Sequence, residues 1–311
     1  MDDTGEKALT AAEEISRMVP KEDEGPSRRA LLWHRILGNK VLIVGSIIVL
    51  IFTFMAVFGP YLTKYDPTKM DFRTRFASPS FEHLMGTDNY GRDTFTRILY
   101  GTRVSFKVGI ISVAIGMIGG SLFGAAGGYI GGLVDELLMR MMDALLAFPP
   151  LLLAIGLVAA AGPSLMTVSV VIGVVYIPRF ARVVRSSVLA EREMEYVEAA
   201  RAIGQSDFKI LVKHIGPSTI SPVVVLGTII FSLAIIIEAS LSFLGVGLPP
   251  PTPSWGTMLD ESRRYLGASI WMPLWPGLTI SIAVLGFNLL GDGLRDFLDP
   301  KFYTAARTTT T

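Results

Sequence analysis

Residues 108–134 read VGIISVAIGMIGGSLFGAAGGYIGGLV, and no charged side chain interrupts the sequence before Asp135. A helix needs about 20 apolar residues to cross the hydrocarbon core of a bilayer. This stretch is long enough for one crossing, and it lacks the alternation of apolar and polar residues that a barrel strand requires. It therefore predicts a membrane-spanning helix.

Four other uncharged stretches lie at residues 41–58, 144–178, 215–237 and 267–291. The stretch 144–178 is too long for one crossing, and the turn signal Ala-Gly-Pro-Ser at residues 161–164 divides it into two. Six spans follow. Because lipid offers no hydrogen bonds to an open backbone, we expect an all-α integral membrane fold with six transmembrane helices.

The composition agrees with a membrane protein and excludes several other classes. Half of the 311 residues are apolar and only 18% are charged, whereas about 25% is usual in soluble chains. A net charge of +1 gives no basic field for nucleic acid. The chain has no cysteine, three scattered histidines and no G-x-x-x-x-G-K-[ST] loop. We therefore expect it to bind no metal, no cofactor and no ATP of its own.

Lys and Arg residues are distributed unevenly about the predicted spans. With six crossings both termini share one side, and 18 of the 28 Lys and Arg residues lie there. Such an excess marks the cytoplasmic side. The predicted order is a cytoplasmic tail at 1–40, a transmembrane domain at 41–292 and a cytoplasmic tail at 293–311. The domain has outer loops at 59–103 and 246–266 and a cytoplasmic loop at 183–217.

The cytoplasmic loop at residues 183–217, or E-A-A loop, contains Glu198-Ala199-Ala200, then Gly204 and Pro217. The two alanines have almost no side chain, so the groove of another protein can close on the backbone. A docking element is one interpretation of this loop. An amphipathic segment lying on lipid headgroups is the other, and the residues alone leave both open.

The local sequence of this loop predicts two short helices. Residues 191–203 favour the first, which Gly204 is expected to end. Ser206 is a natural N-cap for the second. That helix is predicted to have an apolar face of Phe208, Leu211 and Ile215 and to end at Gly216-Pro217.

Glycines at four-residue intervals in the second span, Gly116, Gly120 and Gly124, allow close helix contact. They predict either packing within the chain or an interface with another subunit.

Polar groups at membrane depth are few. Glu238 and Asn288 are predicted either to line a transport pathway or to form structural hydrogen bonds.

Two charged segments outside the spans give simpler predictions. Asp135 and Asp143 are expected to flank a short inner turn, and to cap helices or pair with Arg140. Residues 86–93 contain glycine and Asx residues typical of a tight outer turn. An exposed pair of Arg92 with Asp93 in that turn would contribute only about 0–1 kcal/mol.

Trp255, in a proline-rich outer loop, is typical of a membrane belt.

Spaced motifs along the chain support a family resemblance. Glu198-Ala199-Ala200…Gly204…Pro217 resembles the loop of ABC-importer membrane subunits, although His214 and Gly216 stand where that family usually has Ile and Leu. Residues 30–303 resemble the C-type permease subunits of the dipeptide/oligopeptide branch, in which a His at the first of these positions is familiar. The further motifs are Gly86-Thr87-Asp88-x-x-Gly91-Arg92-Asp93, Gly128-Tyr129-x-Gly131-Gly132, Ala147-Phe148-Pro149, Glu238-Ala239-Ser240-Leu241-Ser242 and Gly291-Asp292-Gly293-Leu294-Arg295-Asp296.

The resemblance implies a type I ABC importer transmembrane domain in the bacterial plasma (inner) membrane. It implies that Glu198, Ala199, Ala200, Gly204 and Pro217 couple transport to ATP hydrolysis. The implied partners are a homologous B-type permease subunit, two ATP-binding subunits that hold ATP and Mg, and an extracytoplasmic substrate-binding protein. The outer loop with Pro253 and Trp255 is implied to face that binding protein.

The expected cargo is a di- or oligopeptide, but the same family also moves glutathione, nickel complexes, opines and oligosaccharides. A secondary transporter would show several buried charges and paired broken helices in inverted halves. A membrane enzyme would show a catalytic pair at depth. The sequence has one deep glutamate and neither feature, so it favours an importer subunit without enzymatic activity of its own.

Overall fold

The computed structural model describes residues 37–298, and most of the two predicted tails lies outside this range. The chain divides into two units, residues 1–39 and 40–311. The second unit contains the helices α3 (Lys40–Phe58), α4 (Thr94–Ile130), α5 (Gly132–Leu146), α6 (Pro150–Ala161), α7 (Leu165–Arg192), α8 (Glu195–Ala202), α9 (Asp207–Ile210), α10 (Gly216–Phe243), α11 (Trp255–Arg263) and α12 (Trp271–Leu298). The predicted all-α class is confirmed for the described residues.

Within the described residues, five helices are long and apolar enough to cross a membrane: α3, α4, α7, the continuous helix 207–243 and α12. The pair α5 and α6 passes the same test together, although the two are bent by 88° at their break. With that pair counted as one broken span, the structure has the six crossings that the sequence predicts.

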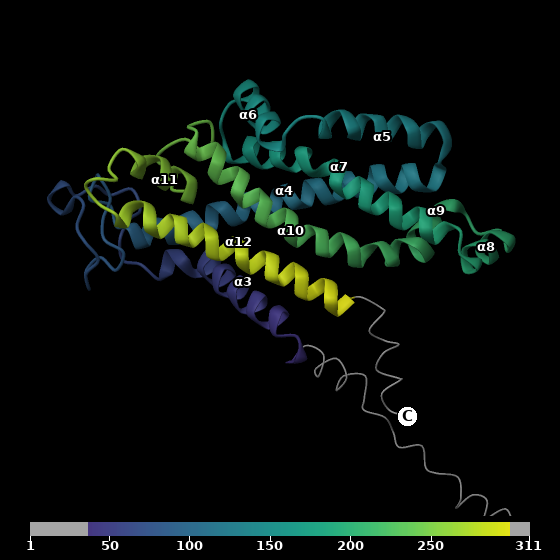
Figure 1. The fold of residues 1–311 in the computed structure, drawn as a ribbon, viewed down its shortest axis with the longest axis horizontal. Helices are drawn as coiled ribbons and strands as arrows, with labels where there is room; N and C mark the ends of the chain where they lie inside the picture. The colour runs from purple at the N-terminus through teal and green to yellow at the C-terminus, as the bar shows by residue number, and fades with distance from the viewer. Residues whose placement is uncertain (1–36, 299–311) are drawn as a thin grey trace, which may run out of the picture. The chain divides into compact units, whose positions relative to one another are not determined.

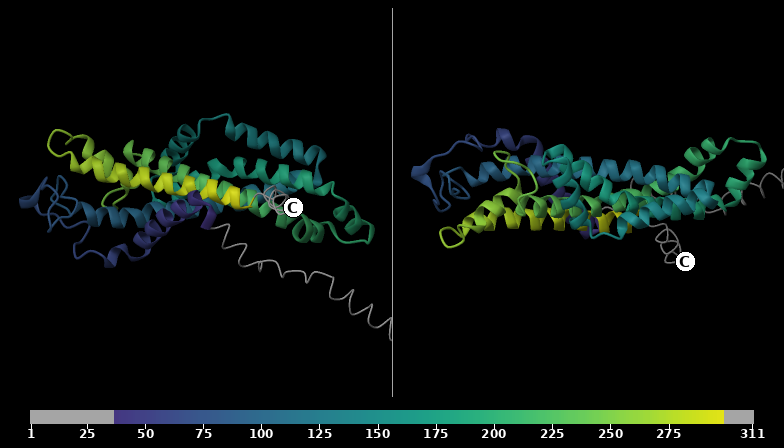
Figure 2. Two further views of the ribbon diagram at one scale, coloured as in Figure 1. Left: turned by 60° about the horizontal axis from the view of Figure 1, so that its bottom comes forward. Right: turned by 90° about the horizontal axis from the view of Figure 1, so that it is seen from above.

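The long helices run along one another, and most of the segments that join them lie at two opposite ends, whereas α6 and its connections to α5 and α7 lie between these ends (Figures 1 and 2). α8 and α9 lie at one end, and α12 finishes on that side; we call this end the inner end and the opposite one the outer end after the topology that the sequence predicts. The residues between α3 and α4, together with α11, lie at the other, the outer end.

The third crossing differs from the prediction. Asp135 and Asp143 belong to α5 rather than to the edges of a short turn. The chain breaks instead between Leu146 and Pro150. Pro149 and Pro150 lack the backbone N–H groups that would continue the helix, and the residue before a proline avoids the helical conformation.

α4 and α7 make the most extensive helix contact in the described chain. A Cβ atom on Gly120 would overlap the Cβ atom of Phe180, and one on Gly124 would overlap the carbonyl oxygen of Ala181. Only glycine fits at these two positions. The glycine stripe of the second span therefore packs within this chain, one of the two predicted alternatives.

Aromatic side chains join α3, α4, α10 and α12. The rings of Phe231 and Phe287 stack at a centroid distance of 4.0 Å, and Phe106 contacts both. Phe52 on α3 meets the Trp255 ring edge to face at 5.8 Å. This cluster fixes α11 against the outer half of the bundle.

Candidate functional site

The E-A-A motif lies on α8, at the inner end of the bundle (Figure 1). Val197 and Ala200 are 0% and 4% exposed, so these side chains fix the helix to the rest of the chain. Glu198 and Ala199 are exposed. The motif thus has a packing side and an outward side, and the outward side offers one carboxylate next to one methyl group.

Gly204 ends α8 as the sequence predicts. Its φ angle is +73°, a left-handed conformation that costs other residues about 1–2 kcal/mol. The Gly204 N–H donates to the carbonyl of Arg201 at 2.9 Å, and the Gln205 N–H donates to the carbonyl of Ala200 at 3.1 Å. A Cβ atom on Gly204 would meet no atom within 4 Å among the described residues, its two chain neighbours aside. The space beside it is open to another molecule.

The second helix of the loop departs from the prediction in two ways. Phe208 is 76% exposed whereas Ile215 is fully buried, so they do not share an apolar face. The helix also does not end at Gly216-Pro217, because a π-helical turn over Leu211–Ile215 leads directly into α10. Pro217 is the second residue of α10 and directly follows this π-helical turn within the continuous helix 207–243.

Ion pairs hold α5 against α7 near this end. Arg185 donates two hydrogen bonds of 2.5 Å to the carboxylate of Asp135. Arg182 donates to Asp143 at 2.7 Å. The predicted pairing of these aspartates with Arg140 is therefore wrong, because both carboxylates face α7 instead.

Tyr196 forms a contact within the E-A-A loop itself. Its hydroxyl donates a hydrogen bond to the carboxylate of Glu191. This bond, reinforced by partial burial, raises the pKa of Tyr196 to about 12. The phenol therefore stays protonated and remains a donor at physiological pH.

At the outer end, four charged side chains form the outer charge cluster: Asp88, Arg92, Arg97 and Glu261. Arg92 donates to Asp88 and to Glu261, each at 2.6 Å. Arg97 donates to the same two carboxylates, at 2.8 Å to Glu261. Asp88, Arg92 and Arg97 are at most 5% exposed. The cluster joins the start of α4 to α11 and balances two positive charges with two negative ones.

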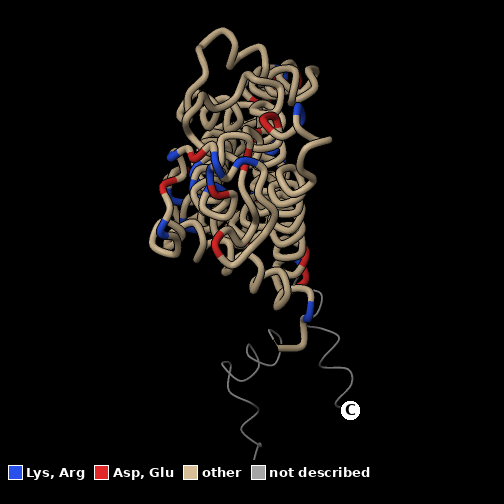
Figure 3. Tube along the Cα trace, turned by 90° about the vertical axis from the view of Figure 1, so that its left-hand side faces the viewer, with Lys and Arg blue, Asp and Glu red and all other residues tan. Residues whose placement is uncertain are grey.

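This cluster corrects the predicted exposed pair of Arg92 with Asp93. Arg92 is buried and bonds Asp88 and Glu261. Asp93 instead caps α4, accepting from the Thr96 N–H at 2.7 Å. No sequence pattern points to Glu261, which is far from Arg97 along the chain. Viewed from the outer end, charged residues of both signs lie close together (Figure 3).

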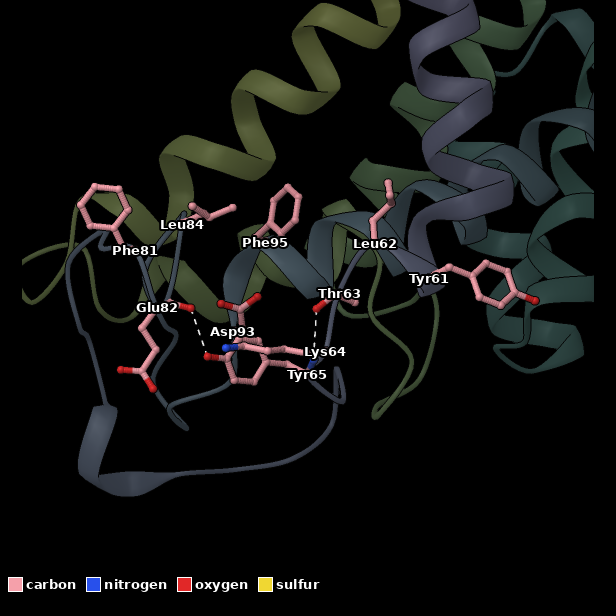
Figure 4. A pocket seen from close by; sticks show the side chains of 10 residues that line it. All are labelled: Tyr61, Leu62, Thr63, Lys64, Tyr65, Phe81, Glu82, Leu84, Asp93 and Phe95. Carbon is pink, nitrogen blue, oxygen red and sulfur yellow. Dashed lines mark hydrogen bonds between the residues drawn. The ribbon is translucent and has the colours of Figure 1, made fainter.

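Asp93 also lies at the edge of a pocket of about 400 Å³ (Figure 4). The other lining residues are Tyr61, Leu62, Thr63, Lys64, Tyr65, Phe81, Glu82, Leu84 and Phe95. The Nδ1 atom of His83 lies 2.9 Å from the Asp93 carboxylate. The Tyr65 hydroxyl donates to the carbonyl of Glu82 at 3.1 Å, which ties two of the lining segments together.

The two polar residues predicted at membrane depth both form side-chain hydrogen bonds. Glu238 on α10 is fully buried. It accepts from the hydroxyls of Ser105 at 3.1 Å and Ser242 at 3.0 Å. Asn288 on α12 is exposed and accepts from Ser232 at 2.9 Å. In this conformation Glu238 therefore serves as a buried hydrogen-bond acceptor between helices. Asn288 remains partly accessible from outside the chain.

Trp255 and Pro253, which the family resemblance places against a binding protein, are both buried by the chain itself. The Trp255 indole N–H donates to the carbonyl of Ile98 at 3.4 Å. The indole lies beside Gly101, whose missing side chain leaves the space. Trp255 is thus a packing residue rather than a belt residue. A partner that contacts this loop would meet exposed neighbours such as Pro250 and Pro251 instead.

Comparison with known proteins gives two matching family models. One, described as a binding-protein-dependent transport system inner membrane component, matches residues 113–303. The other, described as the N-terminal transmembrane domain of oligopeptide transport permease C, matches residues 27–79.

Several known proteins match over nearly their whole length. A putative peptide transport system permease protein of Brucella abortus is 45% identical over 90% of this chain and 94% of its own. The dipeptide transport system permease protein DppC of Alkalihalophilus pseudofirmus is 44% identical over 91% and 93%. The glutathione transport system permease protein GsiD of Pectobacterium atrosepticum is 43% identical over 86% and 90%.

Proposed function

Because the chain belongs to the family of binding-protein-dependent transport system inner membrane components, we propose that it is one of two permease subunits of an ATP-driven peptide importer. It would form half of the pathway beside a homologous B-type subunit. Two ATP-binding subunits would attach at the inner end, and a substrate-binding protein would deliver cargo at the outer end.

Di- and oligopeptides are the proposed cargo. Similar proteins carry names for peptide, dipeptide and glutathione transport, and glutathione is itself a small peptide. ATP and Mg would be held by the partner subunits, since this chain has no phosphate-binding loop. The chain itself would contribute the pathway and the coupling contact.

The proposal rests on the outward side of α8. Glu198 and Ala199 are exposed next to a glycine whose surroundings are open, and α8 is fixed to the bundle by its other side. A tightly fitting partner could therefore push on α8 and move the helices attached to it. Pro217 would fix the direction in which the loop enters α10.

The test uses the complex reconstituted in liposomes with its ATPases, its binding protein and a casein digest as a peptide source. We expect Ala199→Trp to reduce peptide-stimulated ATP hydrolysis to the basal rate, because the indole would fill the docking face. Ala190→Trp is the matched control, since Ala190 is also exposed but lies on α7 outside the motif. Full stimulation in the Ala199 variant would contradict the proposal.

Gly204 gives an independent prediction about the same contact. Gly204→Asn should keep most of the stimulated rate, because asparagine tolerates a positive φ. Gly204→Val should lose it, because a β-branched residue both strains the left-handed backbone and occupies the open space. Equal rates in the two variants, with equal amounts of assembled complex, would argue against a conformational role for this glycine.

We also propose that both termini are cytoplasmic. Single cysteines can report this cleanly because the chain has none. A cysteine at Arg73, in the outer loop, should react with an impermeant maleimide in intact spheroplasts. A cysteine at Asp296, in the last turn of α12, should react only after the membrane is opened. Both positions are exposed, so labelling of Asp296→Cys from outside would overturn the orientation.

A further inference from the structure

The segment Gly128-Tyr129-Ile130-Gly131-Gly132 joins α4 to α5 and lies outside the E-A-A loop. Its glycines at 131 and 132 have φ angles of +72° and +56° and turn the chain between the two helices. The last residues of α4 lie beside the E-A-A loop, as the contacts of Gly128 and Tyr129 with that loop show.

The end of α4 is held against the end of α7. A Cβ atom on Gly128 would lie 3.0 Å from both the carbonyl oxygen of Arg185 and the Cβ atom of Val188. The carbonyl of Gly128 accepts a hydrogen bond of 3.0 Å from Arg192, the last residue of α7. α8 begins only three residues later.

Tyr129 connects α4 to both short helices of the loop. Its hydroxyl donates to the carboxylate of Asp207, the first residue of α9, at 2.6 Å. The guanidinium of Arg201, on α8, lies 5.8 Å from the centre of the Tyr129 ring, within the range of a cation–π contact. One side chain of α4 is therefore held from two sides by the E-A-A loop.

We propose that Tyr129 is a positioning residue that carries movement of the E-A-A loop into α4. The inference rests on the proposed function of that loop. Through the peptide backbone the loop pulls only on α7 and α10, and the contact of Tyr129 with Asp207 adds α4 as a third receiver of the movement.

α4 is suited to carry that movement to the outer end. It has 37 residues, which corresponds to about 55 Å at 1.5 Å per residue, and it lies along α7 for much of this length. Its outer end is capped by Asp93 and contributes Arg97 to the outer charge cluster. A displacement at Tyr129 can therefore reach the surface where cargo would be delivered.

The test measures peptide-stimulated ATP hydrolysis and peptide uptake in the same reconstituted complex. Tyr129→Phe keeps the ring and its cation–π contact with Arg201 and removes the hydroxyl, together with the interactions of that hydroxyl with Asp207 and Arg201. We expect about a threefold to tenfold loss of stimulation, because the lost hydrogen bond is charge-assisted but exposed. Tyr65→Phe is the control, since it removes a phenol hydrogen bond to the carbonyl of Glu82 at the outer end, far from the E-A-A loop, and it should change little.

A double-mutant cycle separates positioning from general damage. Asp207→Ala should match Tyr129→Phe, the two together should be no worse than either alone, and Asp207→Asn, which keeps an acceptor oxygen, should retain most of the stimulation. Additive losses, full stimulation in Tyr129→Phe, or a reduced yield of that complex would each overturn the inference. A loss in Ala199→Trp with none in Tyr129→Phe would leave the proposed function standing and reject only Tyr129. Full stimulation in Ala199→Trp would reject the proposed function itself.

Discussion

Replacing Arg97 with Met should lower the stability of the folded chain by about 3–5 kcal/mol, the usual cost of removing one partner from a buried ion pair. Arg97 is only 2% exposed, and it bonds both Asp88 and Glu261. Without it, two carboxylates would share the single guanidinium of Arg92. The excess negative charge would remain on the buried Asp88 and the partly buried Glu261.

The physical reason can be checked by restoring the charge balance. Arg97→Met combined with Asp88→Asn leaves Arg92 paired with Glu261, and the asparagine keeps the oxygen that accepts from the backbone of Tyr90. The double variant should therefore regain much of the loss. Thermal unfolding of the detergent-purified protein measures the stability of the single and the double variant. Arg103→Met, at an exposed position on the same helix, is the control and should unfold like the parent. A single Arg97 variant as stable as that control would mean that the cluster is electrostatically unimportant.

Glu238→Leu should also have a large effect, reducing the yield of folded protein through a loss of about 2–4 kcal/mol. The carboxyl group accepts from Ser105 on α4 and Ser242 on α10, and a buried hydroxyl left without its partner costs about 1–3 kcal/mol. Glu238→Gln should cost much less, because its amide can serve both hydroxyls once they rotate.

Comparing the two Glu238 variants distinguishes structure from transport. Folded yield by size-exclusion chromatography and peptide uptake should both be near the parental values for Gln, and folded yield should fall for Leu. If the Gln variant folds normally but takes up free-amine peptides poorly, then Glu238 contacts cargo in another conformation. That result would revive the pathway interpretation of this residue.

The spans are predictable from sequence because their signal is local. The uncharged stretch 41–58 predicts a helix, and α3 covers Lys40–Phe58. α4 begins at Thr94, well before its uncharged stretch, because Asp93 caps it there. The neutralisation of Arg97 by two carboxylates in this added part cannot be detected from hydropathy. The break before Pro150 does have a local signal, the two prolines at 149 and 150, but the charged residues before it favour an earlier turn. The charged face of α5 resembles a turn in sequence, although Arg182 and Arg185 on α7 compensate it in the structure.

The residues of the candidate site also divide into those that a local sequence signal predicts and those whose positions depend on distant contacts. The glycine that ends α8 is predictable, since a single residue determines its backbone conformation. The face of the second helix is not, because the π-helical turn at Leu211–Ile215 changes the period on which the prediction depends. The burial of Trp255 and the partner of Tyr129 depend on contacts between segments far apart in sequence. No local pattern reveals them.

The break between α5 and α6 limits where lipid can surround the protein. Pro149 and Pro150 cannot donate to the carbonyls of Leu145 and Leu146, which therefore lack helical partners. Acyl chains offer no hydrogen bonds, and exposed backbone at membrane depth is found only against protein or water. We therefore expect a neighbouring subunit or a hydrated passage, rather than annular lipid, beside this bend.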